Sequence, residues 1–198
     1  MTQPLQFVAP EELARANLYG LIARLFYSAP DAQLISELLH APAIEGDGEL
    51  AAAWRAMLEA CRTAFPVALD DEHTQLFVGT GAAEVTPYLS HYVVRYSTDN
   101  PLVELRQQLA AWGMGRKQEA PEYEDHVSGL CEAMRFAIAV QQRKPEEQRE
   151  FFERFIHRGA IALCDAVAAS KNARFYQHVA RFARAFFEIE KAAFEMVG

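Results

Sequence analysis

Residues 10–30 read PEELARANLYGLIARLFYSAP, and this stretch sets the pattern that decides the fold. It opens on Pro10, a residue favoured at the first position of a helix. Glu11 and Glu12 follow, where negative charge complements the helix dipole. Apolar residues then recur at three- and four-residue spacing until Pro30 closes the segment. The stretch is therefore predicted to be a helix that ends before Pro30. Its predicted buried stripe comprises Leu18, Leu21, Ile22 and Leu25.

The same spacing recurs along most of the 198-residue chain, whereas strand-like alternation is nearly absent. We therefore expect an all-α protein, in which residues 1–198 form a single-domain bundle of about nine to eleven helices. One helix is predicted to begin at Asp70 and Asp71, and another, which begins at Pro145, to break or bend at Gly159. Further helices are predicted at residues 32–40, 49–64, 101–112, 121–144, 160–169 and 172–196.

Residues 78–100 interrupt the helical pattern with glycines, prolines, tyrosines and small polar residues. Loops of this length in a compact domain are usually functional or disordered, and this one is too rich in aromatic and β-branched residues for disorder. We expect a packed, extended, non-helical segment that joins possible sub-bundles at 1–77 and 101–198. Because such a hinge permits exchange of halves, a monomer or a domain-swapped dimer is expected.

The charge and the cysteines exclude several classes of protein. With 19 basic and 27 acidic residues, a net charge of −8 and no basic run, the chain is not expected to bind nucleic acid, and a basic partner is favoured. No apolar run approaches the ~18 residues of a membrane span, so no membrane insertion is expected. An odd number of widely spaced cysteines is typical of a reduced, cytoplasmic protein. They are Cys61, Cys131 and Cys164.

Three short patterns stand out in chain order. LFVG at 76–79 has the form of an apolar helix end closed by a glycine. PYLSHY at 87–92 has the form of a proline turn with packed aromatic residues. EYEDH at 122–126 follows Pro121 and would place acids in a first helical turn, where the dipole favours them. Each pattern alone has this ordinary structural interpretation.

In this order, the patterns resemble the signature of the TorD/DmsD family of chaperones for molybdenum-containing redox enzymes. That signature pairs Leu-Phe-x-Gly with Pro-x-x-Ser-x-aromatic and later has Glu-Pro-x-Asp-His. In this chain Tyr123 replaces the proline of the last element. The residues that match are Leu76, Phe77 and Gly79, then Pro87, Ser90 and Tyr92, and finally Glu122, Asp125 and His126.

The resemblance implies a chaperone without catalytic turnover. Its partner would be the precursor of a molybdoenzyme catalytic subunit, bound in the cytoplasm through its twin-arginine signal peptide until the cofactor is inserted. Carboxylates hold guanidinium groups in bidentate pairs. Two acidic clusters, at 70–72 and 122–125, therefore suit such a peptide, and Leu76, Phe77, Tyr88 and Tyr92 are expected to line an apolar groove. The full predicted binding set is Glu122, Asp125, His126, Leu76, Phe77, Pro87, Tyr88, Ser90 and Tyr92.

His126 leaves alternatives open, because it suits a hydrogen bond to Asp125, a bond to a loop carbonyl, or a response to pH. The other function considered is a helical metal- or nucleotide-binding enzyme. Glu122, Asp125 and His126 offer metal ligands, but no second Glu-x-x-His pair completes a di-iron site. Residues 79–81 are too short for a phosphate loop. No cofactor is therefore expected, although the resemblance implies weak guanine nucleotide binding. An aromatic-lined sensor is less favoured, because the stripe Phe182, Phe186 and Phe187 has core spacing.

Overall fold

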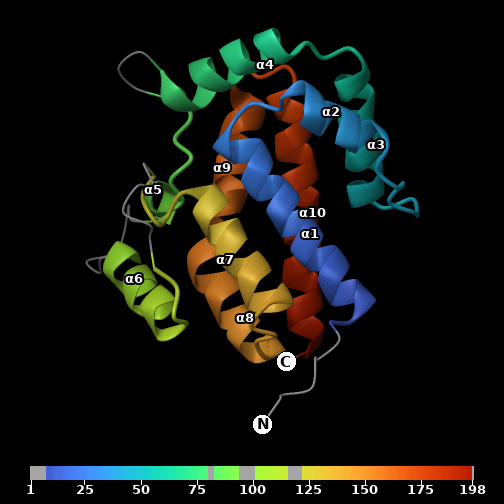
Figure 1. Cartoon of the computed structure of the whole chain (residues 1–198). Coiled ribbons are helices and arrows are strands. Elements are labelled where there is room, and N and C mark those ends of the chain that lie inside the picture. Colours follow the sequence, from blue (N-terminus) through green and yellow to red (C-terminus); the bar gives the residue numbers. More distant parts are fainter. Residues whose placement is uncertain (1–7, 80–82, 94–100, 116–121, 198) are drawn as a thin grey trace.

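The computed structural model describes residues 8–79, 83–93, 101–115 and 122–197 (Figure 1). Within these ranges the chain folds as an assembly of helices without strands, so the predicted all-α fold is confirmed. None of the described helices is both long and apolar enough to cross a membrane. The α-helices are α1 (Pro10–Tyr27), α2 (Ala32–Leu39), α3 (Glu49–Arg62), α4 (Pro66–His73), α5 (Ser90–Val93), α6 (Pro101–Ala111), α7 (Val127–Ala139), α8 (Pro145–Phe151), α9 (Arg158–Ala169) and α10 (Tyr176–Val197). Two π-helical turns, Thr74–Val78 and Phe152–His157, follow α4 and α8.

The helices pack in pairs around one core. Figure 1 shows α1 and α7 side by side in front of α9 and α10, with α2 and α3 at one flank and α6 at the other. Helix α4 crosses one end of this bundle. The N-terminal helix α1 thus packs mainly on α7, which lies in the C-terminal half of the chain.

Aromatic side chains dominate the core. On α1, Ile22 and Leu25 are fully buried as predicted, but Leu18 and Leu21 are only half-buried. Tyr19 and Phe26 complete the buried face of that helix. The stripe of Phe182, Phe186 and Phe187 lies in the core as expected, and so do the three cysteines. No part of that stripe is exposed enough to form an aromatic ligand pocket.

The predicted helix start at Asp70 and Asp71 is wrong, because α4 begins earlier, at Pro66. Proline lacks a backbone N–H and has a fixed φ, so it can open a helix as readily as it can end the previous one. Asp70 and Asp71 therefore lie inside α4, where both are exposed. The prediction for LFVG is confirmed, since Gly79 ends the π-helical turn with a φ of +65°.

Gly159 does not break a helix, contrary to the prediction, and lies near the start of α9. A Cβ atom at this position would lie 2.7 Å from Leu89 Cβ and 2.8 Å from the Leu89 carbonyl oxygen. The glycine is therefore needed for the close approach of another segment, and not for a bend. The change of helical geometry falls instead in the π-helical turn Phe152–His157.

The segment at 78–100 is not wholly non-helical, because α5 lies within it. Its first turn is closed by hydrogen bonds from His91 N to Tyr88 O (3.2 Å) and from Tyr92 N to Leu89 O (3.1 Å). One helical turn is too short to produce a visible apolar period, which explains why the sequence pattern missed it. Residues 83–89 are non-helical, as predicted, and the remaining positions, 80–82 and 94–100, lie outside the described residues.

Candidate functional site

The second and third sequence patterns lie side by side. Tyr88 and His126 form an isolated antiparallel bridge. On either side of it, Leu89 N donates to Asp125 O at 2.9 Å, and Val127 N donates to Pro87 O at 3.0 Å. Two segments more than thirty residues apart in sequence are thus joined by their backbones.

Hydroxyl groups of the first segment donate to carboxylates of the second. The Tyr88 hydroxyl donates to Glu122, and the Ser90 hydroxyl donates to Asp125. Burial raises the pKa of Tyr88, and the hydrogen bond to Glu122 raises it further, so the phenol stays a donor. Asp125 is itself buried, and its carboxylate is engaged inside the protein.

His126 acts as the N-terminal cap of α7. Its Nδ1 accepts the backbone N–H of Ser128 at 3.1 Å, and the Ser128 hydroxyl donates to Ala23 O on α1 at 2.8 Å. The helix therefore begins at Val127 and not near Pro121. The acids of EYEDH lie in the turn before the helix instead of in its first turn. For His126, the structure thus shows a role as a cap, which was not among the predicted alternatives.

The other predicted site residues are buried or half-buried. Leu76 is fully buried and Phe77 nearly so, and the Phe77 ring packs 5.7 Å from Phe26 and 5.1 Å from Tyr176. Pro87 is buried, and half-buried Tyr92 donates from its hydroxyl to Thr86 O at 2.9 Å. Leu76 and Phe77 therefore belong to the core and do not line a surface groove.

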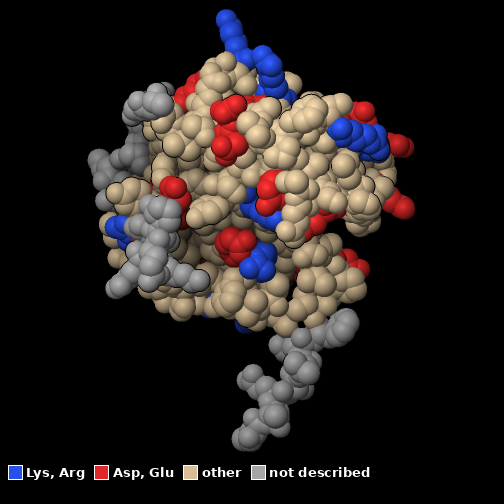
Figure 2. Space-filling model, turned by 45° about the horizontal axis from the view of Figure 1, so that its top comes forward, with Lys and Arg blue, Asp and Glu red and all other residues tan. Residues whose placement is uncertain are grey.

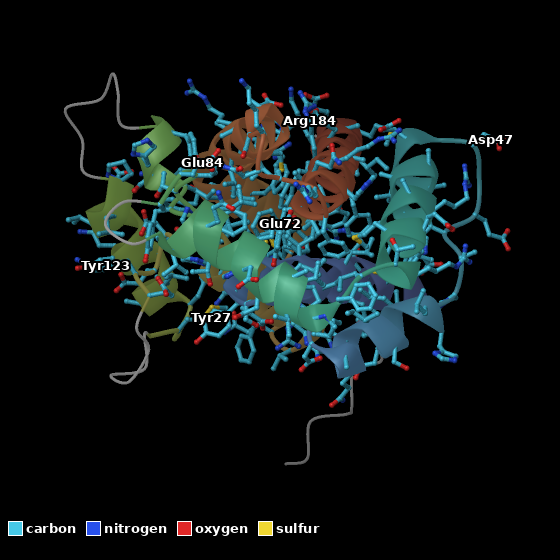
Figure 3. The ribbon with its side chains drawn as sticks, turned by 90° about the horizontal axis from the view of Figure 1, so that it is seen from above. Tyr27, Asp47, Glu72, Glu84, Tyr123 and Arg184 are labelled. Carbon is cyan, nitrogen blue, oxygen red and sulfur yellow. The ribbon has the colours of Figure 1, made fainter. Side chains whose placement is uncertain are left out.

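One member of the acidic cluster at 70–72 has a structural role, whereas Asp70 and Asp71 are exposed. The Glu72 carboxylate accepts three backbone N–H groups at the start of α10, from Arg174 (2.8 Å), Phe175 (3.1 Å) and Tyr176 (2.8 Å). Figure 3 shows Glu72 near the middle of the molecule, seen from above. These bonds engage both oxygens of the carboxylate in holding α10 to α4.

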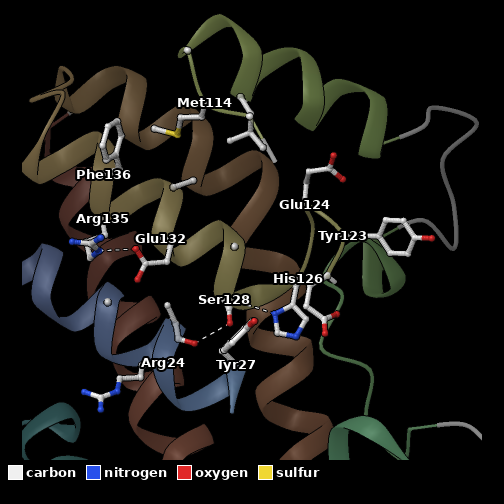
Figure 4. A pocket seen from close by; sticks show the side chains of 18 residues that line it. Arg24, Tyr27, Met114, Tyr123, Glu124, His126, Ser128, Glu132, Arg135 and Phe136 are labelled. Carbon is white, nitrogen blue, oxygen red and sulfur yellow. Dashed lines mark hydrogen bonds and ion pairs between the residues drawn. The ribbon is translucent and has the colours of Figure 1, made fainter. Parts of the chain in front are cut away.

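An open groove of about 840 Å³ lies between α1, α7 and the C-terminal end of α6 (Figure 4). Its walls are largely apolar and include the side chains of Tyr27, which is 56% exposed, and Phe136, which is 37% exposed. Four small residues on α1 and α7 also line it, namely Gly20, Ala23, Gly129 and Ala133. Its charged lining residues are Glu122, Glu124, Glu132, Arg24 and Arg135. Of the predicted binding residues, Glu122 and His126 line the groove.

The charges at the groove are largely matched. Arg135 pairs with Glu132 at 2.7 Å, and Arg24 pairs with Glu37 at 2.7 Å. On the face drawn in Figure 2, acidic groups are likewise spread over the surface, several of them beside a basic group. The net charge of −8 therefore does not gather into a single acidic patch on that face. Sequence reasoning missed this groove because its lining comes from three distant helices.

Comparison of the chain with known proteins identifies its family. Residues 45–188 match the family model described as nitrate reductase delta subunit. The chain belongs to this family. Its members are TorD-type chaperones that mature redox enzymes, so the resemblance seen in the sequence is confirmed. No curated protein matches the chain.

A solved structure from Archaeoglobus fulgidus, provisionally described as a redox enzyme maturation protein, has the same fold. The likeness covers 95% of this chain and 98% of that one, with a TM-score of 0.52 and 17% sequence identity. At this identity the comparison supports the shared fold alone. It agrees with the family assignment, which rests on residues 45–188.

The histidine cap predicts a pH dependence of stability in this family member. Burial lowers the pKa of His126 below its ordinary value of about 6.5, so the unfolded chain takes up a proton before the folded chain does. Stability should therefore fall as the pH drops from about 7 to about 5. His126→Asn, which keeps a capping acceptor, should show a shallower fall in urea unfolding. Equal slopes for the two proteins would contradict this prediction.

A metal site requires several carboxylate, histidine or cysteine side chains close together. Among the residues that the structure describes, no group of three or more His, Cys, Asp or Glu side chains is placed to hold a metal ion. Glu122 and Asp125 instead accept hydrogen bonds from Tyr88 and Ser90. Hydroxyl groups of the neighbouring segment therefore engage both carboxylates.

Proposed function

We propose that this maturation chaperone binds the twin-arginine signal peptide of a molybdenum-cofactor redox enzyme. It would hold the peptide in the cytoplasm until the cofactor has been inserted and export can begin. The observation that carries the proposal is the apolar groove whose edge bears Glu122, next to the joined motifs. Family membership supports the general role, and the groove supports a peptide as its ligand.

The groove matches the chemistry of such a peptide, which presents guanidinium groups followed by an apolar stretch. Glu122 accepts one hydrogen bond from Tyr88, and a carboxylate has about four acceptor sites, so capacity remains for an arginine. The exposed rings of Tyr27 and Phe136 offer apolar surface for the rest of the peptide. In this proposal Tyr88 positions Glu122 at the edge of the groove.

The remaining predicted residues take a supporting role in this proposal. Asp125 and Ser90 hold the two motifs together, and His126 fixes the start of α7. Pro87 and Tyr92 shape the turn that carries Tyr88. Finally, Leu76 and Phe77 anchor the end of the π-helical turn in the core.

Titration calorimetry with two synthetic peptides tests the proposal. One carries an Arg-Arg pair before an apolar stretch, and the other carries Lys-Lys in its place. The arginine peptide should bind more tightly, because only guanidinium forms two parallel bonds to a carboxylate. Glu122→Gln should weaken its binding about tenfold, as expected when a charge-assisted hydrogen bond loses its charge. Equal affinity for both peptides would contradict the proposal.

Matched variants separate the groove from the general surface. Glu146→Gln removes an exposed carboxylate on α8, which does not line the groove, and should leave binding unchanged. Phe136→Ala removes an exposed ring from the groove wall and should weaken binding. Val140, 58% exposed just after α7, is outside the lining, so Val140→Ala is its control. If Phe136→Ala and Val140→Ala weaken peptide binding equally, the peptide does not bind in the groove.

A further inference from the structure

Glu124 of the groove lining already holds a guanidinium group, which belongs to Arg106 of α6. The pair is bidentate, with Nε to Oε1 and Nη2 to Oε2 both at 3.1 Å. The Glu124 side chain is 13% exposed, whereas that of Arg106 is 47% exposed. Figure 4 shows the Glu124 side chain directed toward α6 at the wall of the groove. Solvent thus reaches the arginine more freely than the carboxylate.

This geometry is the one in which proteins recognise arginine. Two parallel N–H···O bonds match the planar fork of guanidinium to the two oxygens of a carboxylate. An ammonium group cannot make this pair of bonds. Glu124 therefore occupies a position at the groove that is shaped for an arginine side chain.

Helix α6 is held to the bundle by other contacts besides this pair. Trp112, just after the helix, stacks on Phe151 with ring centroids 4.7 Å apart, and the Arg143 guanidinium lies 4.8 Å from the Trp112 ring centre. A second ion pair joins Glu104 to Arg154 at 2.8 Å, and neither residue lines the groove. The helix therefore keeps an anchor when Arg106 leaves Glu124.

We propose that Glu124 determines specificity by receiving an arginine of the bound peptide, and that Arg106 occupies this carboxylate as an internal competitor. This inference rests on the proposed function, whose ligand it refines. The incoming guanidinium replaces Arg106 with the same hydrogen-bond geometry, so the carboxylate stays paired throughout the exchange. A ligand that lacks arginine displaces Arg106 poorly, because it forms fewer hydrogen bonds to the Glu124 carboxylate than Arg106 does.

Calorimetry with the Arg-Arg peptide tests the competition. Arg106→Gln removes the competitor and should lower the Kd about two- to fivefold, the range of exposed ion pairs. Arg154→Gln breaks the other ion pair of α6 and should leave the Kd unchanged. Arg106→Lys keeps the charge on α6 without the fork and should give a smaller gain. Thermal unfolding of each variant, followed by circular dichroism, verifies that the fold is kept.

A second test exchanges the two charged residues of the pair. The double variant Arg106→Glu with Glu124→Arg can keep the ion pair but presents a guanidinium to the groove, so it should bind the Arg-Arg peptide at least tenfold more weakly. Equal Kd values for wild type and Arg106→Gln, or equal gains from Arg106→Gln and Arg154→Gln, would overturn the inference while the proposed function stands. A wild-type chain that binds no peptide would overturn both.

Discussion

Replacing Glu190 by alanine is expected to lower the free energy of unfolding by about 3 kcal/mol, the lower end of the range for a broken buried ion pair. The Glu190 carboxylate is 2% exposed and binds the Arg15 guanidinium at 2.8 and 2.7 Å. It also accepts the hydroxyl of fully buried Tyr19 at 2.9 Å. The substitution leaves both donors without this acceptor, although Arg15 keeps its bonds to Glu12.

Urea unfolding measures this effect, with Glu188→Ala as the matched control. Glu188 lies two residues earlier on α10, is 45% exposed and pairs with Arg184 at 3.3 Å. Exposed pairs of this kind contribute little, so the control should change stability by less than about 0.5 kcal/mol. Similar losses from both variants would show that the buried network does not hold α1 to α10.

Gly159→Val is expected to cost about 1–3 kcal/mol and to weaken peptide binding as well. The new Cβ would lie 2.7 Å from Leu89 Cβ and 2.8 Å from its carbonyl oxygen, so the backbone around Leu89 has to move. The N–H of Leu89 donates to Asp125 O, and its neighbour Tyr88 is bridged to His126. Displacement of this segment therefore disturbs the junction that positions Glu122.

Gly48→Ser is the control for that substitution. Nothing lies within 4 Å of a Cβ built on Gly48, which caps the start of α3, and serine is a good capping residue. The control should retain full stability and full peptide binding. If Gly159→Val unfolds at the same urea concentration as wild type, the tight packing against Leu89 does not constrain the junction.

The sequence predicted the helices whose ends carry strong local signals. Pro10 and Pro145 begin α1 and α8 as expected, because proline favours the first helical position regardless of what packs nearby. The start of α4 at Pro66 was placed too late, at Asp70 and Asp71, and the helix expected from Pro121 begins only at Val127, because proline can either begin a helix or end the previous one. Local propensity does not distinguish these uses without knowledge of the neighbours.

The candidate site was predicted in part. Residues of the segments 87–92 and 122–126 were assigned to one binding set, and the bridge between Tyr88 and His126 shows that these two segments do lie side by side. Leu76 and Phe77 were expected at a groove but are buried, because apolar spacing does not tell which apolar residues lie beneath a site. Gly159 was expected to bend a helix, but it permits a close approach of Leu89 instead. The sequence pattern does not reveal this contact, because Leu89 is seventy residues away in sequence.

By itself, then, the sequence determined the helical class, the family and most of the buried stripes, since each depends on local spacing or on short motifs. Only the tertiary structure decided which charges are available for binding. Glu72 caps α10, Asp125 binds Ser90, and Glu124 holds Arg106 at the groove. These roles depend on distances between segments far apart in the chain, and a carboxylate looks the same in a sequence whether it is engaged inside the protein or lines a groove.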